Sequence, residues 1–342
     1  MKAAILVKSK EDLVIRDIEL PKKLFFGQVL VKIKYSGICG AQLNEIDAVK
    51  GKDNFLPHLL GHEGSGIVEK VGEGVKTVKK GDHVVLHWRK GSGIESQTPK
   101  YLLGRKTINA GWVTTFNEKA IVSENRITKI PKNFDLKLAP LFGCSITTAF
   151  GVVNNDAKIK IGESVVIFGV GGVGLNIAQA SSMVSAFPII GVDINQFKLN
   201  LGKKFGLTHS LLFTKKNIQK KIDKILKGEK PDIVIDTTGI SDVIELAYSI
   251  TSSKGKTILV GVPKDKISIY SLPLHFEKII TGSHGGDSNP DYDIKRYIQL
   301  FKGKKINLSK IITNEFSLDE INKAIKLFRK GNVGRIIINM EN

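Results

Sequence analysis

The stretch VVIFGVGGVG at residues 165–174 decides the fold of this chain. Its first four residues form an apolar run typical of a buried strand, and Gly169, Gly171 and Gly174 follow directly in the spacing Gly-x-Gly-x-x-Gly. Glycines at this spacing allow a tight turn, the close approach of a pyrophosphate and close packing of the next helix. The free N–H groups at the start of that helix favour phosphate. We therefore predict a dinucleotide-binding turn between a strand and a helix.

An acidic residue lies where the next predicted strand ends. Asp193 follows the apolar segment 188–192 and comes 19 residues after Gly174. An acidic side chain at about this distance hydrogen-bonds the ribose hydroxyls of NAD and would repel the 2′-phosphate of NADP. Lys198 is a candidate for a further contact with the same ribose. We predict NAD as the cofactor in preference to NADP, the alternative being a glycine-rich turn that binds nothing.

The sequence on either side of this turn predicts two domains, which is also what a length of 342 residues suggests. Before residue 140 the chain is rich in glycine turns and short apolar runs, as in the segment 61–85, and this texture is typical of a small β-rich domain. After residue 150, apolar runs alternate with helical segments, which indicates an α/β fold with a doubly wound parallel sheet. The expected strands are 29–35, 84–86, 165–168, 188–192, 233–236, 257–260, 279–281 and 335–339, with a helix at 194–205 and a break in the pattern at 287–292.

The net charge of +19 comes from lysine rather than arginine, since only 7 of the 52 basic residues are arginines. Proteins that read nucleic acid use arginine for bidentate contacts with phosphate and guanine. No run of like charge in this chain is long enough to form an interaction tail. We interpret the lysines as the basic surface of a globular protein that binds no nucleic acid, with an anionic partner or substrate as the alternative.

Neither a membrane span nor a disulfide framework is expected. Residues 164–192 contain no charged side chain, but Asn176, Gln179 and Pro188 interrupt them, and they divide into strand, turn, helix and strand. A spanning helix needs about 20 mostly apolar residues. Two cysteines cannot build a disulfide scaffold. We therefore expect a cytoplasmic protein with both thiols reduced.

Both cysteines and one histidine lie in glycine-containing segments. Cys39 lies in SGICG, His62 in GHE and Cys144 in GCSITT. Two thiolates and one imidazole make a three-ligand zinc set with an open fourth position, which is typical of catalytic zinc. These residues are far apart in the chain, however. On spacing alone, two small buried side chains and a hydrogen-bonded histidine are the simpler interpretation.

A family resemblance changes that interpretation. The segment GHEGSGIVEKVGEGV, residues 61–75, is similar to the zinc-containing alcohol dehydrogenase signature of the medium-chain dehydrogenase superfamily. The resemblance covers nearly the whole chain, and its further motifs are GICG around Cys39, GCSITTAFG at residues 143–151, the glycine turn, Asp193 and the closing Gly334-Arg335. It implies a GroES-like catalytic domain made of residues 1–145 and 287–342, and a Rossmann domain that binds NAD at residues 146–286.

The resemblance also implies roles for single residues. Cys39, His62 and Cys144 would hold one catalytic zinc, and Glu63 would lie directly behind the metal as an alternative ligand or as electrostatic support. The other implied roles concern the cofactor and the substrate: Gly172 in the pyrophosphate turn, Val173 against the nicotinamide face that receives no hydride, Thr148 beside the nicotinamide, Arg335 at the pyrophosphate and Trp88 in the wall of the substrate pocket.

Two segments depart from the family pattern. The region that corresponds to the structural-zinc lobe, residues 91–112, contains no cysteine, so the chain is limited to one thiolate-bound zinc. The role of this region is open between a substrate lid, an oligomer contact and a surface loop. After Cys39, Ala41 and Gln42 replace the hydroxyl and the carboxylate from which the family builds a proton relay and supports the metal. The candidates for a substitute path, besides water, are Asn44, His58 and His87.

Together these features predict a zinc- and NAD-dependent dehydrogenase that interconverts an alcohol and an aldehyde or ketone. A zinc-free enone or quinone reductase of the same superfamily, a catalytically impaired NAD-binding sensor and a nucleic-acid-binding protein are the alternatives. The complete ligand set argues against the first of these, and the scarcity of arginine against the last. The substrate is a small molecule of open identity, and the basic residues between Arg89 and Lys106 suggest a sugar-like or anionic one. We expect a homodimer or homotetramer.

Overall fold

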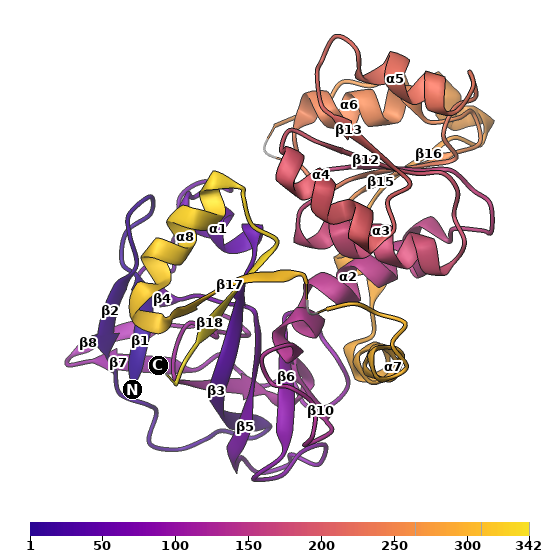
Figure 1. Cartoon of the computed structure of the whole chain (residues 1–342). Helices are drawn as coiled ribbons and strands as arrows, with labels where there is room; N and C mark the ends of the chain where they lie inside the picture. Colours follow the sequence, from indigo (N-terminus) through magenta and orange to yellow (C-terminus); the bar gives the residue numbers. More distant parts are fainter. Residues whose placement is uncertain (264, 309, 342) are drawn as a thin grey trace.

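The computed structural model describes residues 1–263, 265–308 and 310–341, and these form two bodies (Figure 1). One body is a parallel sheet between layers of helices. The other contains two mainly antiparallel sheets and both ends of the described chain (Figure 1). Within the predicted catalytic segment 287–342, Ser309 and Asn342 lie outside the described residues.

The parallel sheet follows from apolar strands that are buried on both faces. Its strands β11 (Val165–Phe168), β12 (Ile189–Asp193), β13 (His209–Leu212), β14 (Ile233–Asp236), β15 (Lys256–Leu259) and β16 (Ile279–Gly282) are arranged in the order β13-β12-β11-β14-β15-β16. Val165 and Ile167 pack into one hydrophobic core, whereas Val166 and Phe168 pack into another. Helices therefore cover both faces, and the strands need no polar alternation. This confirms the predicted doubly wound α/β fold.

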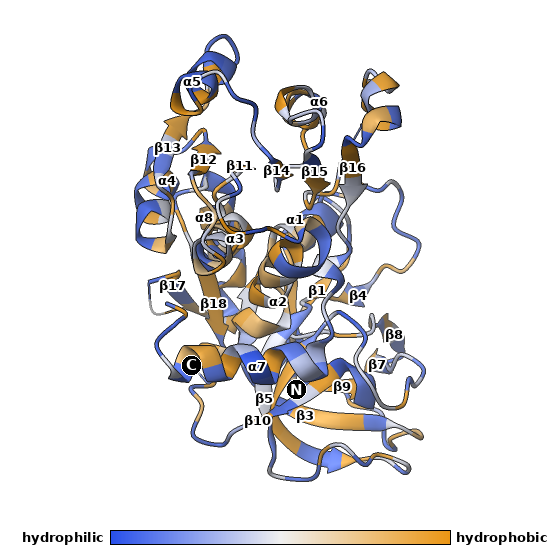
Figure 2. Cartoon of the chain, turned by 90° about the vertical axis from the view of Figure 1, so that its right-hand side faces the viewer, coloured by the Kyte–Doolittle hydropathy of each residue, from blue (hydrophilic) through white to orange (hydrophobic). Residues whose placement is uncertain are grey.

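Two helices of this body, α5 (Ile218–Ile225) and α6 (Ser241–Ile250), are amphipathic, whereas α3 (Gly172–Met183) is buried along most of its length. Figure 2 shows hydrophobic and hydrophilic residues side by side along α5 and α6, as expected where one face packs on a sheet and the other meets water. The helix predicted at 194–205 is shorter, because a 3-10 turn replaces its end before Gly206, which has a φ of 100°. The helices are α3 (Gly172–Met183), α4 (Gln196–Gly202), α5 (Ile218–Ile225) and α6 (Ser241–Ile250).

The second body is β-rich, as predicted. One sheet has the order β2-β1-β4-β8-β7, with β1 (Lys2–Leu6), β2 (Val14–Asp17), β4 (His58–Leu59), β7 (Lys100–Leu103) and β8 (Lys106–Asn109). The larger sheet has the order β10-β6-β5-β3-β18-β17, with β9 also paired to β3. Its strands are β3 (Gln28–Ile38), β5 (Glu63–Val71), β6 (His83–His87), β9 (Lys119–Ser123), β10 (Ile127–Ile130), β17 (Ile312–Ser317) and β18 (Arg335–Asn339).

The last strand returns the chain to its first segment. Ile336 of β18 lies opposite Ile38 of β3, and Ile338 lies opposite Ser36. This pairing brings Arg335, at the start of β18, close to the end of β3. The strand β17 was not predicted from the sequence, because its residues ITNEFS are half-buried and mostly polar. The domain limits 1–145, 146–286 and 287–342 stay a prediction.

Both bodies contribute to one hydrophobic core. The core contains Val85 of β6, Ile146, Leu175 of α3 and Ile294, so side chains of the β-rich body and of the parallel-sheet body pack in a single cluster.

In the part of the chain that the structure describes, no helix is long and apolar enough to cross a membrane. The remaining α-helices are α1 (Gly40–Ile46), α2 (Ser145–Gly151), α7 (Pro290–Lys302) and α8 (Ile321–Lys330).

Candidate metal and cofactor site

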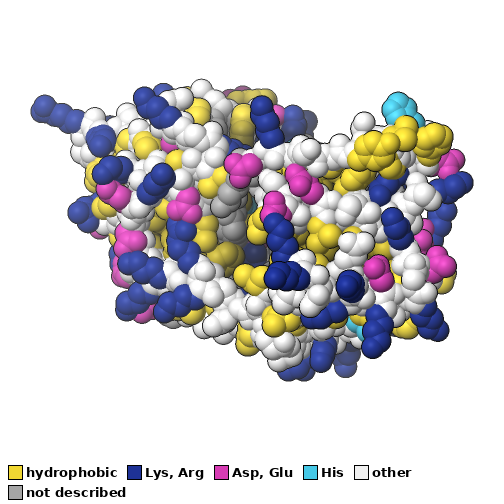
Figure 3. Space-filling model, turned by 90° about the horizontal axis from the view of Figure 1, so that it is seen from above, with side chains coloured by type: hydrophobic (Ala, Val, Ile, Leu, Met, Phe, Trp, Pro, Cys, Tyr) yellow, Lys and Arg dark blue, Asp and Glu magenta, His cyan; other side chains and the backbone are white. Residues whose placement is uncertain are grey.

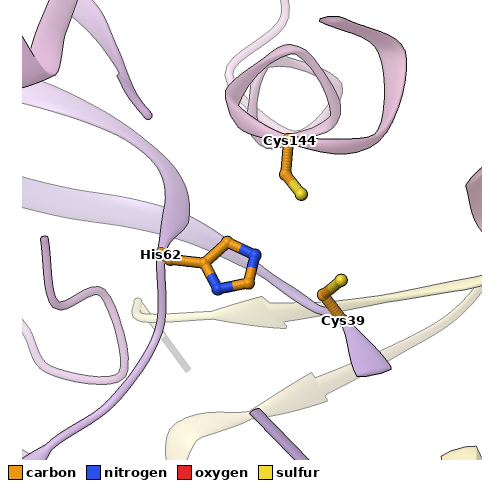
Figure 4. Close-up of side chains that lie close together, drawn as sticks. All are labelled: Cys39, His62 and Cys144. Carbon is orange, nitrogen blue, oxygen red and sulfur yellow. The ribbon is translucent and has the colours of Figure 1, made fainter. Parts of the chain in front are cut away.

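The three predicted metal ligands come together at the ends of regular elements. Cys39 lies between β3 and α1, His62 precedes β5, and Cys144 precedes α2. One ligand atom from each lies within 4.8 Å of the other two. Figure 4 shows both sulfur atoms and one nitrogen of the His62 ring facing a common centre. Three segments that are far apart in the sequence therefore present their donors to one point.

This donor set fits a zinc ion. Nε2 of His62 is buried and has no hydrogen-bond partner among the described residues, although buried polar atoms normally have one. The thiol of Cys144, with smaller effects of His62 and Arg335, holds the pKa of Cys39 well below its usual range, which favours the thiolate. Two sulfur ligands and one imidazole nitrogen are the protein ligands of one type of catalytic zinc site.

Gln42 connects two of the three ligands. It is fully buried on α1, where its Oε1 accepts the backbone N–H of Cys39 at 2.7 Å and its Nε2 lies 2.6 Å from Nδ1 of His62. From the sequence, Gln42 was expected to replace the carboxylate of the family with a side chain that can hydrogen-bond but carries no charge. The available signal was its position three residues after Cys39, because a side chain at the third position of a helix reaches back to the residue that caps it.

Glu63 and Arg335 form a buried ion pair. Oε1 of Glu63, at the start of β5, contacts Nη2 of Arg335, and the two residues are 0% and 2% exposed. A Cβ on Gly172 would lie 2.4 Å from Cδ of Arg335, so the close approach of the arginine requires glycine in the turn. Arg335 therefore extends from Glu63 to the glycine turn. Its predicted contact with a pyrophosphate, and the predicted contact of Glu63 with a metal, stay predictions.

The glycine turn lies between β11 and α3, as expected. Gly169 has a φ of 88°, in the left-handed region that favours glycine, and a Cβ on Gly174 would lie 2.0 Å from the carbonyl oxygen of Gly169. Asp193, at the end of β12, accepts the N–H of Val170 at 2.7 Å through one oxygen and that of Asn195 at 2.8 Å through the other. The structure thus fixes the predicted ribose-binding carboxylate directly beside the turn.

The other predicted cofactor and substrate residues surround this region. Thr148 is buried on α2, four residues after the second cysteine ligand. Val173, in the first turn of α3, packs against the shared core. Trp88 follows β6 and packs edge-on against His284, with ring centroids 5.1 Å apart. Lys198 is partly exposed on α4. Their contacts with a nicotinamide, a substrate and a ribose stay predictions.

The basic residues at 89–106 have partners of opposite charge or lie on an exposed hairpin. Arg89 pairs with Asp287 at 3.1 Å, and Lys90 pairs with Glu95 at 2.6 Å. On the face of the molecule drawn in Figure 3, Lys and Arg side chains are spread over the surface with Asp and Glu between them, rather than gathered in one block. The local surroundings therefore weaken the case for an anionic substrate. The remaining basic residues of the segment lie exposed on the β7–β8 hairpin: Lys100, Arg105 and Lys106.

His58 is a poor candidate for a substitute proton path, because both of its ring nitrogens are engaged. Nε2 lies 2.8 Å from a carboxylate oxygen of Asp53, and Nδ1 lies 2.9 Å from the carbonyl oxygen of Leu59. His87 is engaged in the same way. Its Nδ1 lies 2.7 Å from the carbonyl oxygen of Arg89, and its Nε2 lies 3.0 Å from the hydroxyl of Thr128. Of the predicted candidates, water and Asn44 remain.

We expect His87 to make the fold less stable in mild acid. Burial lowers the pKa of His87 to about 4, whereas histidine in an unfolded chain has a pKa of about 6.5. As the pH falls from about 6.5 to about 4, the unfolded chain binds a proton that the folded protein does not, so the free energy of unfolding decreases by up to about 3 kcal/mol. Urea unfolding at neutral and mildly acidic pH measures this loss, which should be smaller in His87→Gln.

The control for this measurement is His275→Gln, which removes an exposed histidine. This variant should retain the acid sensitivity of the wild type. Equal acid sensitivity of the wild type and His87→Gln would contradict the prediction.

The class of protein follows from three features taken together. They are a parallel sheet with a glycine turn, a β-rich second body, and a cluster of two cysteines and one histidine. This combination is typical of a two-domain dehydrogenase of the zinc-binding type. Residues 26–132 match the model of the alcohol dehydrogenase GroES-like domain, and residues 172–303 match that of the zinc-binding dehydrogenase. The chain is 30% identical to alcohol dehydrogenase class-P of Arabidopsis thaliana, over 99% of this chain and 97% of that protein. The chain therefore belongs to the zinc-containing alcohol dehydrogenase family of medium-chain dehydrogenases.

Solved structures agree with this assignment. The crystal structure of an alcohol dehydrogenase zinc-binding domain protein from Burkholderia ambifaria is similar with a TM-score of 0.90 and 26% identity, over 99% of this chain and 98% of that one. Benzyl alcohol dehydrogenase from Acinetobacter calcoaceticus is similar with a TM-score of 0.89 and 26% identity, over 99% of both chains. The similarity spans both bodies and confirms the predicted pairing of a GroES-like with a Rossmann fold.

Proposed function

We propose that this protein uses zinc and NAD to interconvert an alcohol and the corresponding aldehyde or ketone. The observation that carries the proposal is the convergence of Cys39, His62 and Cys144, because a three-ligand set leaves a coordination position to the substrate. Zinc in this site would act as a Lewis acid that lowers the pKa of an alcohol and so prepares it to give hydride to the nicotinamide. The related proteins named above, which are alcohol dehydrogenases, support the same reaction class.

In this proposal the protein's own residues bind and orient the two reactants. The N–H groups at the start of α3 would bind the pyrophosphate, and the fixed carboxylate of Asp193 would accept hydrogen bonds from the ribose hydroxyls. Holding the reacting carbon against the nicotinamide ring is the main contribution that a protein makes to such a reaction. The proposed contacts are Gly169, Gly171, Gly172, Gly174 and Arg335 at the pyrophosphate, Lys198 at the ribose, Thr148 and Val173 at the nicotinamide, and Trp88 at the substrate.

We expect Asp193→Asn to weaken the preference for NAD over NADP. The substitution removes the negative charge that would face a 2′-phosphate and keeps nearly the same size, but it also exchanges one of the two acceptors of backbone N–H groups for a donor. The ratio of kcat/KM with NADP to kcat/KM with NAD should rise about tenfold, or about 1.4 kcal/mol. Rates of NADH and NADPH formation from one alcohol measure this ratio.

The matched control for this experiment is Asp232→Asn, because Asp232 also accepts a backbone N–H, that of Ser164, in the same body. This variant should leave the cofactor ratio unchanged. A wild type that prefers NADP, or an unchanged ratio in Asp193→Asn, would contradict the assignment of NAD.

A catalytically impaired NAD-binding sensor is the second candidate function. It is favoured by Ala41, which has no hydroxyl to pass a proton, and by the engagement of both ring nitrogens of His58. A dehydrogenase needs a path for the alcohol proton, whereas a sensor does not. Tight NADH binding without turnover across a broad panel of alcohols would establish the sensor, and turnover of any of them would eliminate it.

The finer properties of the protein stay predictions. The substrate is proposed to be a small alcohol or carbonyl compound, with a sugar-like character still open. Assembly as a homodimer or homotetramer is supported by exposed apolar side chains near the edge strand β16, because Tyr270 and Phe276 are 71% and 66% exposed. Light scattering measures this assembly, and a monomer would rule it out. A cytoplasmic location is proposed as well.

A further inference from the structure

We infer that Gln42 determines which ring nitrogen of His62 carries the proton, and that it thereby limits how tightly the cluster binds zinc. The inference rests on the zinc site of the proposed function and concerns a residue that acts through a ligand. Gln42 is therefore a positioning residue. Its effect follows from the donors and acceptors that surround it in a buried pocket.

The orientation of the Gln42 amide follows from its partner on α1. The backbone N–H of Cys39 can only donate, so the amide atom that faces it at 2.7 Å is the carbonyl oxygen. The amide nitrogen then faces Nδ1 of His62 at 2.6 Å. Since an amide NH₂ can only donate, Nδ1 must accept. A neutral His62 ring therefore carries its proton on Nε2, the nitrogen that faces the two sulfur atoms (Figure 4).

This tautomer opposes metal binding. A metal ligand needs the lone pair of Nε2, which moves the ring proton to Nδ1. The N–H of Nδ1 would then face the NH₂ group of Gln42, and two donors would oppose each other. Rotation of the amide relieves this contact but turns the NH₂ group toward the N–H of Cys39. Because Gln42 is 0% exposed, either arrangement leaves a buried donor without its acceptor, which is unfavourable.

A carboxylate at the same position removes the conflict. Its two oxygens accept simultaneously from the N–H of Cys39 and from Nδ1–H of His62, and glutamate has the length of glutamine. We therefore expect Gln42→Glu to bind zinc about tenfold to a hundredfold more tightly than the wild type, as measured by competition with a chelator.

The ring tautomer provides a readout that does not depend on the metal or on activity. Nitrogen-15 NMR of the zinc-free protein should show the His62 proton on Nε2 in the wild type and on Nδ1 in Gln42→Glu. The His62 signals are assigned with His62→Gln. The wild-type measurement alone tests the inference, even where a variant fails to fold. A wild-type His62 that carries its proton on Nδ1 would overturn it.

The control variant for zinc affinity is Asn44→Asp. It adds the same charge on the same helix, at a side chain with no hydrogen bond to His62 among the described residues. We expect its affinity for zinc to change less than about threefold, because screening reduces the effect of a charge without direct contact. Equal gains in Asn44→Asp and Gln42→Glu, or no gain in Gln42→Glu, would overturn the inference. Since neither assay involves alcohol or NAD, failure of the proposed dehydrogenase activity is a separate result.

Discussion

The Cys39→Ser variant is expected to form NADH from alcohol at least about a thousandfold more slowly in kcat/KM than the wild type. The structure places the Cys39 sulfur within 4.8 Å of the other two ligand atoms and favours its thiolate. A serine hydroxyl at this position remains protonated and is a much poorer zinc ligand than a thiolate. Loss of the Lewis acid removes several kcal/mol of transition-state stabilisation, and each 1.36 kcal/mol corresponds to a factor of about ten in rate.

Two further measurements, the zinc content of each variant and the activity recovered when zinc is added, test whether the loss of activity is due to loss of the metal. The wild type should lose activity when a chelator removes its zinc and regain activity when zinc returns, whereas Cys39→Ser should bind little zinc and recover little activity. Cys144→Ser, the equivalent change at the second sulfur ligand, should behave in the same way. Full activity of either variant, or an active wild type without zinc, would refute the proposed role of the cluster and would favour a zinc-free reductase of the same superfamily.

The parallel-sheet half of the fold was predictable because its signals are local. Residues 165–168 form the strand β11 with the predicted limits, since a run buried on both faces of a sheet needs no tertiary information to stand out. The turn that follows is defined by its glycines, and Asp193 lies beside it at the expected spacing. In contrast, β17 was missed because its burial depends on its pairing with β18. The residues ITNEFS show no periodic pattern that predicts this pairing.

The convergence of the two cysteines and the histidine was predictable only through the family resemblance. Cys39, His62 and Cys144 lie in three separate segments, and spacing alone favoured ordinary buried residues. The second layer of the site was not predictable even with the resemblance. Gln42 departs from the family pattern, and its contact with His62 depends on the angle between α1 and the segment before β5. The partner of Glu63 was also hidden, because Arg335 reaches it only when β18 pairs with β3.

The ion pair between Glu63 and Arg335 is expected to be essential for the stability of the fold. Glu63→Gln alone and Arg335→Met alone should each lower the free energy of unfolding by about 3–5 kcal/mol, because each leaves an uncompensated charge in the interior. The two residues are 0% and 2% exposed, so water cannot replace the missing partner. Urea unfolding of the protein without zinc or cofactor measures these changes and keeps them separate from ligand binding.

The double variant distinguishes a structural ion pair from two independent functional residues. If the two charges mainly compensate each other, Glu63→Gln combined with Arg335→Met should cost clearly less than the sum of the single changes, with a coupling energy of about 2 kcal/mol or more. Additive losses would mean that each side chain has another stabilising partner. Lys326, which pairs with Asp12 at 64% and 60% side-chain exposure, supplies the control. The corresponding changes Lys326→Met and Asp12→Asn should each cost less than about 1 kcal/mol, because a solvated ion pair contributes little to stability.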